Sequence, residues 1–87
     1  MNIQIELSLY PLGVEHLGQP IEEFVQSLEN EGLKVELGRM SSIVEGECKE
    51  IFPLLGEVFD NIAGRFPCVL LIKASNSCPT GIKNKTK

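Results

Sequence analysis

The chain has 87 residues and a formal net charge of −4, a length that fits one domain because compact domains hold roughly 50–250 residues. Its hydrophobic fraction of 43% and charged fraction of 23% are ordinary for a globular fold and argue against disorder. No stretch resembles a signal peptide, and no apolar run approaches the roughly 20 residues of a membrane-spanning helix. We therefore expect a cytoplasmic protein that does not bind membranes.

Charge is unevenly distributed along the chain. Residues 1–75 hold all twelve acidic residues and five of the eight basic ones, whereas the other three basic residues are lysines in the segment 76–87. An acidic body repels polyanions, so we expect no nucleic-acid partner. We interpret residues 76–87 as a C-terminal loop and a solvated basic tail.

Cysteine and histidine usage argues against a metal centre. Cys48, Cys68 and Cys78 form no CxxC motif, and His16 is the only imidazole, so a structural metal site would lack ligands. Cys68 is expected in the core and Cys78 in a loop. We predict no metal and no cofactor.

The first elements in chain order are a strand and a helix. Residues 3–10 alternate between apolar and polar side chains, the pattern of a half-buried strand, and Pro11 predicts its end. Pro20 suits the first turn of a helix. The apolar stripe of that helix consists of Ile21, Phe24, Val25 and Leu28. Gly32 is predicted to end the helix in a left-handed conformation.

The next stretch, VELGRMSSIVEGE at residues 35–47, predicts a hairpin on which the rest of the chain is organised. Two β-favouring runs flank residues 38–40, which leave room only for a tight connection, so the two strands should pair antiparallel. Ser41 and Ser42 begin the second run and are the most chemically suggestive polar residues of the chain.

A second helix and a final strand complete the series. The apolar face of that helix consists of Ile51, Leu54, Leu55, Val58, Phe59 and Ile62. Pro53 is compatible with a helix that begins near Glu50, or with one that begins at Glu47 and kinks, and Gly64 is the expected end. Residues 68–74 are almost continuously apolar, which indicates burial on both faces of the strand.

The order β-α-β-β-α-β predicts a ferredoxin-like α+β fold: a four-stranded antiparallel sheet with two helices on one face, in a single domain of residues 1–75. Because the helices cover one face only, something else should cover the open side of the last strand. Fold alone does not give function. An RNA-recognition module would need several aromatic residues on its central strands, and a phosphatase would need a cationic ligand beside Gly13; the sequence offers neither.

Three short motifs do point to a family. SLYPL at residues 8–12, the hairpin sequence above, and SNSCPTG at residues 75–81 together resemble the small thiamine-binding proteins of the YkoF-like family. The resemblance implies dimers or tetramers formed through the sheets, and non-catalytic binding of thiamine or its hydroxymethylpyrimidine moiety. Where the family's turn often holds proline or glycine, this chain has Arg39 and Met40, so the rim of its pocket departs from the family pattern.

Candidate ligand contacts follow from the chemistry of that ligand. A serine hydroxyl both donates and accepts, so Ser41 or Ser42 suits the edge of an aminopyrimidine; periodicity leaves open which one faces it. A thiazolium cation favours an aromatic face, such as Tyr10, or a carboxylate, such as Glu6 or Glu45.

Two further residues complete the candidate site. Ser8 shares the polar face of the first strand with Tyr10, and Met40 could line the pocket, although each of these side chains also has a purely structural interpretation. The alternative function is a structural or regulatory oligomer without a small-molecule ligand. A third hypothesis, an enzyme that uses Cys78 as its nucleophile, lacks an assigned base.

Overall fold

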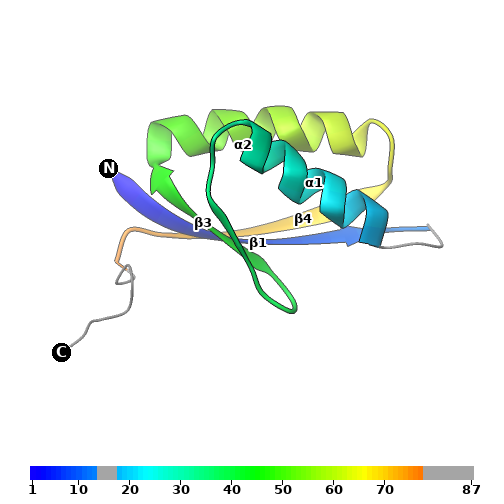
Figure 1. Ribbon diagram of the computed structural model, residues 1–87, viewed down its shortest axis with the longest axis horizontal. Coiled ribbons are helices and arrows are strands. Elements are labelled where there is room, and N and C mark those ends of the chain that lie inside the picture. Colours follow the sequence, from blue (N-terminus) through cyan, green and yellow to red (C-terminus); the bar gives the residue numbers. More distant parts are fainter. Residues whose placement is uncertain (14–17, 78–87) are drawn as a thin grey trace.

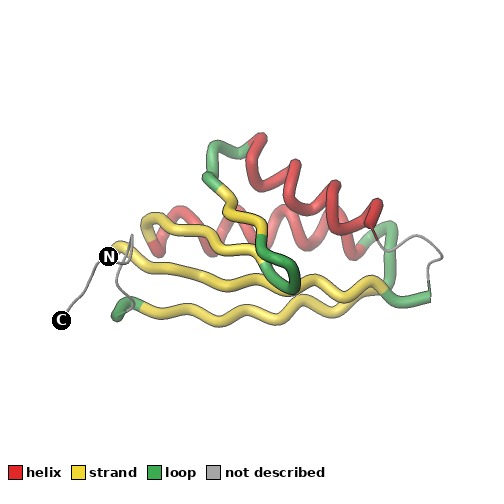
Figure 2. Tube along the Cα trace, turned by 60° about the horizontal axis from the view of Figure 1, so that its bottom comes forward, coloured by secondary structure: helices red, strands yellow, loops and turns green. Residues whose placement is uncertain are grey.

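The computed structural model describes residues 1–13 and 18–77. Its elements are β1 (Asn2–Pro11), α1 (Gly18–Asn30), β2 (Val35–Leu37), β3 (Ser42–Glu47), α2 (Cys48–Ala63) and β4 (Cys68–Ser75). This order confirms the predicted β-α-β-β-α-β arrangement. Figure 1 shows both helices on the same side of the sheet, and Figure 2 shows the two layers from another direction.

The sheet has the strand order β2-β3-β1-β4, and all neighbouring strands are antiparallel. β1 is therefore a central strand with partners on both sides. Its Leu7 lies opposite Ser42 of β3 and Ile72 of β4. Because side chains alternate along a strand, Leu7 and these partners face the helices, while Glu6 and Ser8 face the open side.

The core lies between the sheet and the helices. Its buried side chains are Ile3, Ile5, Leu7, Phe24, Leu28, Val44, Ile51, Leu55, Val58 and Ile62. The strand contributions come from alternate positions, and the helix contributions fall at the predicted helical spacing. The apolar stripes read from the sequence therefore form the contact between the two layers.

The end of α1 follows its sequence prediction. Gly32 has a φ of +92°, a left-handed conformation. The backbone N–H of Gly32 donates to the carbonyl of Glu29 at 2.9 Å, and that of Leu33 donates to the carbonyl of Leu28 at 3.2 Å. These two bonds form a Schellman motif, which uses carbonyls that the helix leaves without intrahelical donors.

The start of α2 decides between the two helix starts that Pro53 allowed. The N-cap is Glu47 and the helix begins at Cys48, so Pro53 lies inside it and not in its first turn. A start near Glu50 is wrong. The missing N–H of Pro53 removes one helical hydrogen bond, that to the carbonyl of Lys49. Gly64 is the C-cap, as the sequence predicted.

The apolar strand β4 lies at an edge of the sheet. Its Val69 and Leu71 pair with Tyr10 and Ser8 and face the open side, where they are 44% and 56% exposed. Within the described residues the chain leaves this face uncovered, so its cover stays a prediction. Among the same residues, no helix is long and apolar enough to cross a membrane.

Candidate functional site

The open face of the sheet carries a hollow of about 310 Å³, which we call the open-face hollow. It lies where the outward side chains of β1 and β4 meet the turn between β2 and β3. Its lining residues are Glu6, Ser8, Tyr10, Met40, Ser41, Leu71, Ile72 and Lys73. Residues far apart in the sequence thus converge because β1 runs between the hairpin and β4.

A carboxylate lies at the centre of the polar contacts in this hollow. The Ser41 hydroxyl donates to Oε2 of Glu6 at 2.7 Å, and the Lys73 ammonium lies 3.4 Å from Oε1. Glu6 and Lys73 are direct cross-strand partners. The pKa of Glu6 is lowered below its usual value, mainly by the hydrogen bond from Ser41 and secondly by Lys73. This carboxylate is therefore charged at neutral pH.

The hairpin turn positions Ser41 through its own backbone. The N–H of Gly38 donates to the carbonyl of Ser41 at 2.8 Å and closes the turn. A Cβ on residue 38 would lie 2.9 Å from that same oxygen, so a glycine is required at this position. Ser8 adds a longer contact, with its hydroxyl 3.4 Å from the carbonyl of Met40. These contacts hold the turn over β1.

Five of the residues predicted from the sequence meet in the open-face hollow: Glu6, Ser8, Tyr10, Met40 and Ser41. The side chains of Tyr10 and Met40 are 46% and 86% exposed and form its rim. A ligand here would lie against one aromatic ring, two hydroxyl groups and one carboxylate.

The structure places the other two predicted residues elsewhere. Ser42 lies opposite Leu7, faces the helix side and is 7% exposed. It lines a smaller cavity of about 100 Å³ between the hairpin and α1, which Ser8, Met40 and Ser41 also line. Glu45 lies on the open face opposite Gln4, but it accepts a hydrogen bond from Asn2 at 3.2 Å and does not line the hollow. Of the two serines, Ser41 is therefore the one beside the open-face hollow. Cys78 lies outside the described residues.

Sequence reasoning did not assign Lys73, Leu71 or Ile72 to the site. Lys73 is the only charged residue within β4, and it shares its face with Val69 and Leu71. That signal becomes useful only once β4 is paired with β1 in the observed register, which puts Lys73 opposite Glu6. The sequence alone does not give that register.

The donor set of the hollow suits a polar, partly aromatic molecule. Carboxylate and hydroxyl oxygens accept hydrogen bonds from an amine, and the Tyr10 ring offers a face to a flat or cationic group. Within residues 1–13 and 18–77, no cluster of three histidine, cysteine or acidic side chains could hold a metal ion.

A comparison with protein families decides the wider relationship. The model of a family described as thiamine-binding protein matches residues 5–77. The chain belongs to the thiamine-binding protein family. The matched range contains every described residue of the open-face hollow, and it confirms the resemblance that the three sequence motifs indicated.

Solved structures show the same fold. One is a Thermotoga maritima protein described as a candidate for thiamine biosynthesis or salvage; it has 22% identity and a TM-score of 0.79, with 88% of this chain and 85% of that chain covered. A Streptococcus pneumoniae protein has 18% identity and a TM-score of 0.83, with 94% and 93% covered. A comparison with curated protein sequences finds no match.

Proposed function

We propose that this protein is a non-catalytic, cytoplasmic binding protein for thiamine or its hydroxymethylpyrimidine moiety, and that it binds this ligand in the open-face hollow as a homo-oligomer. The observation that carries the proposal is the family match across residues 5–77, which span a hollow with the hydrogen-bonding groups an aminopyrimidine needs.

Glu6 and Ser41 would bind the amine of the pyrimidine. The Ser41 hydrogen atom is directed at Glu6, so the lone pairs of its oxygen are left to accept from a ligand. The second carboxylate oxygen of Glu6 faces Lys73, whose side chain is 83% exposed. A long, exposed lysine can move aside at little cost, so a ligand amine or a thiazolium cation would replace it beside Glu6.

Self-association would complete the site. Small-molecule sites in proteins bury most of the ligand, whereas the open-face hollow is bounded by one sheet face and one turn. Tyr10, Met40, Val69 and Leu71 are exposed on the same face. A second subunit that covers these apolar side chains would also cover the ligand, which is why we propose a dimer or tetramer formed through the sheets.

Calorimetric titration with thiamine, and separately with hydroxymethylpyrimidine, tests the proposal. We expect saturable binding that Ser41→Ala weakens by about 1 kcal/mol, roughly fivefold in Kd, because one hydrogen-bonding partner is lost. Ser27→Ala is the matched control, since Ser27 lies on α1 and does not line the hollow. Absence of binding to both compounds would overturn the proposal.

The second candidate function is a structural or regulatory oligomer without a small-molecule ligand. The exposed apolar side chains of the open face favour it on their own, because they need a cover but not a ligand. It predicts an oligomer whose size and melting temperature are indifferent to thiamine, and whose size is unchanged when Ser41 and Ser42 are both replaced by alanine.

A further inference from the structure

A second hollow lies between α1 and β2, away from the open face of the sheet. It measures about 510 Å³, and we call it the α1–β2 groove. Its lining residues are Ile21, Glu22, Glu23, Val25, Gln26, Glu29 and Leu37. None of them lines the open-face hollow, so this groove is a separate surface of the molecule.

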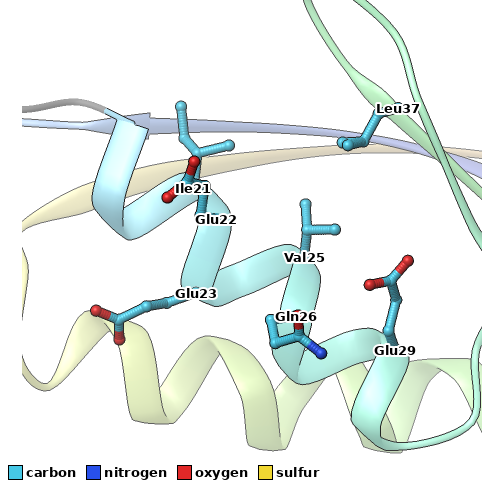
Figure 3. A pocket seen from close by; sticks show the side chains of 7 residues that line it. All are labelled: Ile21, Glu22, Glu23, Val25, Gln26, Glu29 and Leu37. Carbon is cyan, nitrogen blue, oxygen red and sulfur yellow. The ribbon is translucent and has the colours of Figure 1, made fainter.

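The floor of the α1–β2 groove is apolar. Leu37 at the end of β2 is 68% exposed, and Ile21 and Val25 lie on the facing side of α1. Figure 3 shows Ile21 and Val25 directed to the side of the helix on which Leu37 lies, whereas Glu23 points away from Leu37. An exposed leucine above an apolar helix face is typical of a surface that receives another segment.

The rim of the groove is acidic. Glu22 and Glu29 are seven residues apart on α1, which is about two turns or 10.5 Å along one side of the helix. Glu23 is engaged elsewhere, because its carboxylate accepts from Arg65 at 2.6 Å. Among the residues that the structure describes, Glu22 and Glu29 belong to no ion pair. The groove therefore matches a segment with two or more positive charges.

Residues 83–87, KNKTK, are such a segment. They carry Lys83, Lys85 and Lys87 and no acidic residue, while residues 1–75 carry every acidic residue of the chain. In an extended conformation these alternate lysines lie on one side, about 7 Å apart. Lysine stems cover apolar surface while their ammonium groups stay in water or beside a carboxylate. This pattern is complementary to an apolar floor with an acidic rim.

The tether is long enough for the C-terminal lysines to reach the groove of their own chain. Lys83 lies six residues and Lys87 ten residues after Ser77, so an extended chain places them at most about 20–22 Å and 33–36 Å from it. Leu37 lies about 18 Å from Ser75 in the sheet, because the two are three strands and three residues apart in the observed register. A segment joined to its target by a short tether has an effective concentration in the millimolar range, so the groove of the same molecule is favoured over that of a second copy.

We propose that residues 83–87 bind in the α1–β2 groove of their own chain, with lysine stems over Leu37 and ammonium groups beside Glu22 and Glu29. The bound tail covers the groove and neutralises part of its charge. This inference does not depend on the proposed function, because the two hollows share no residue.

Zero-length carbodiimide cross-linking of the full chain, mapped by mass spectrometry, tests this proposal. We expect the tail lysines to be joined to Glu22 or Glu29 in preference to Glu57 and Asp60, which are exposed on α2, and we expect the preference to be lost in 1 M salt. A mixture of nitrogen-14 and nitrogen-15 protein separates links within a chain from links between chains. Equal linkage to the α2 carboxylates, links only between chains, or no link to Glu22 or Glu29 would overturn the proposal.

A second measurement avoids the cross-linker. Lys83→Gln, Lys85→Gln and Lys87→Gln together should shift the methyl NMR signals of Val25 and Leu37, and the combined Glu22→Gln and Glu29→Gln variant should shift them in the same direction. The combined Glu57→Gln and Asp60→Asn variant is the matched control. Signals that do not respond to the lysine changes contradict docking of the tail.

Discussion

At the scale of single residues, Glu6 is the most informative side chain of the open-face hollow. It is held by one hydroxyl from the hairpin turn and one ammonium from the neighbouring strand. Ser41 and Ser42 differ by one position in the chain but face opposite sides of the sheet, because side chains alternate along an extended backbone. Only one of the two serines can therefore affect the charge of Glu6 directly.

Ser41→Ala should raise the pKa of the Glu6 carboxyl toward its usual value. The hydroxyl of Ser41 stabilises the charged form, and its hydrogen bond is the largest cause of the lowered pKa. Lys73 keeps part of the effect, so the rise is incomplete. NMR titration of the side-chain carboxyl measures it, with Ser27→Ala as the control. If Glu6 has the same pKa in Ser41→Ala as in the control Ser27→Ala, the assigned role of Ser41 is wrong.

The ion pair between Glu23 and Arg65 predicts a pH-dependent stability. The pKa of Glu23 is lowered below its ordinary value of 4.5, mainly by the hydrogen bond from Arg65. A lowered pKa contributes stability that is present above pH 4.5 and is lost as the pH falls through the folded-state value. Because this pair joins α1 to Arg65, two residues after the end of α2, it connects the two helices.

Glu23→Gln should therefore lower the melting temperature at pH 7 and have little effect near pH 3. Thermal unfolding of the variant and the unchanged protein between these pH values measures the difference. Glu57→Gln is the control, since Glu57 is exposed on the other helix and takes part in no ion pair of the described residues. A difference that persists unchanged at pH 3 would show that the ion pair is not its source.

At the scale of elements, α2 carries two residues that weaken helices, Pro53 and Gly56. Gly56 is exposed, and a Cβ built on it meets nothing within 4 Å. Its backbone is helical, so alanine fits without strain. Gly46 of β3 is different, because an added Cβ would lie 3.1 Å from Cδ1 of the fully buried Ile51.

Gly56→Ala should raise the free energy of unfolding by about 0.5–1 kcal/mol, since alanine loses less backbone entropy in a helix than glycine does. Gly46→Ala, the same chemical change in β3, should lower it because Ile51 has to move. Urea denaturation of both variants gives the two signs. Destabilisation by Gly56→Ala would mean that the helix surface at this position is covered by another part of the assembly.

The elements were largely predictable from the sequence. Alternation in residues 3–10, the apolar stripes of both helices and Gly32 report local backbone geometry, and the structure reproduces each of them. The start of α2 was open because Pro53 allows two local solutions. Which of Ser41 and Ser42 faces the open side of the sheet was open, because Ile43 and Val44 are both apolar. It is fixed only by the pairing of β3 with β1, a contact between distant parts of the chain.

At the scale of the whole molecule, the decisive feature is that only one face of the sheet is covered within the described residues. A chain of this size buries only roughly 60% of its unfolded surface, so further burial through association would add useful stability. Tyr10, Val69 and Leu71 are apolar side chains on adjacent strands of the open face, and Met40 lies at its edge. Their proximity to Glu6 and Ser41 connects self-association with ligand binding.

Leu71→Glu should therefore convert the proposed oligomer into a monomer and weaken thiamine binding at the same time. Leu71 is 56% exposed and lies opposite Ser8 in the hollow, so a glutamate there would bring charge into the interface and repel Glu6. Phe52→Glu is the matched control, because Phe52 is 42% exposed on α2 and does not line the hollow. Sedimentation velocity measures size, and calorimetry on the same samples measures binding. If Leu71→Glu keeps the size of the unchanged protein, the open face is not the interface. If it becomes a monomer and still binds thiamine with unchanged affinity, one chain suffices for the site and the second subunit does not complete it.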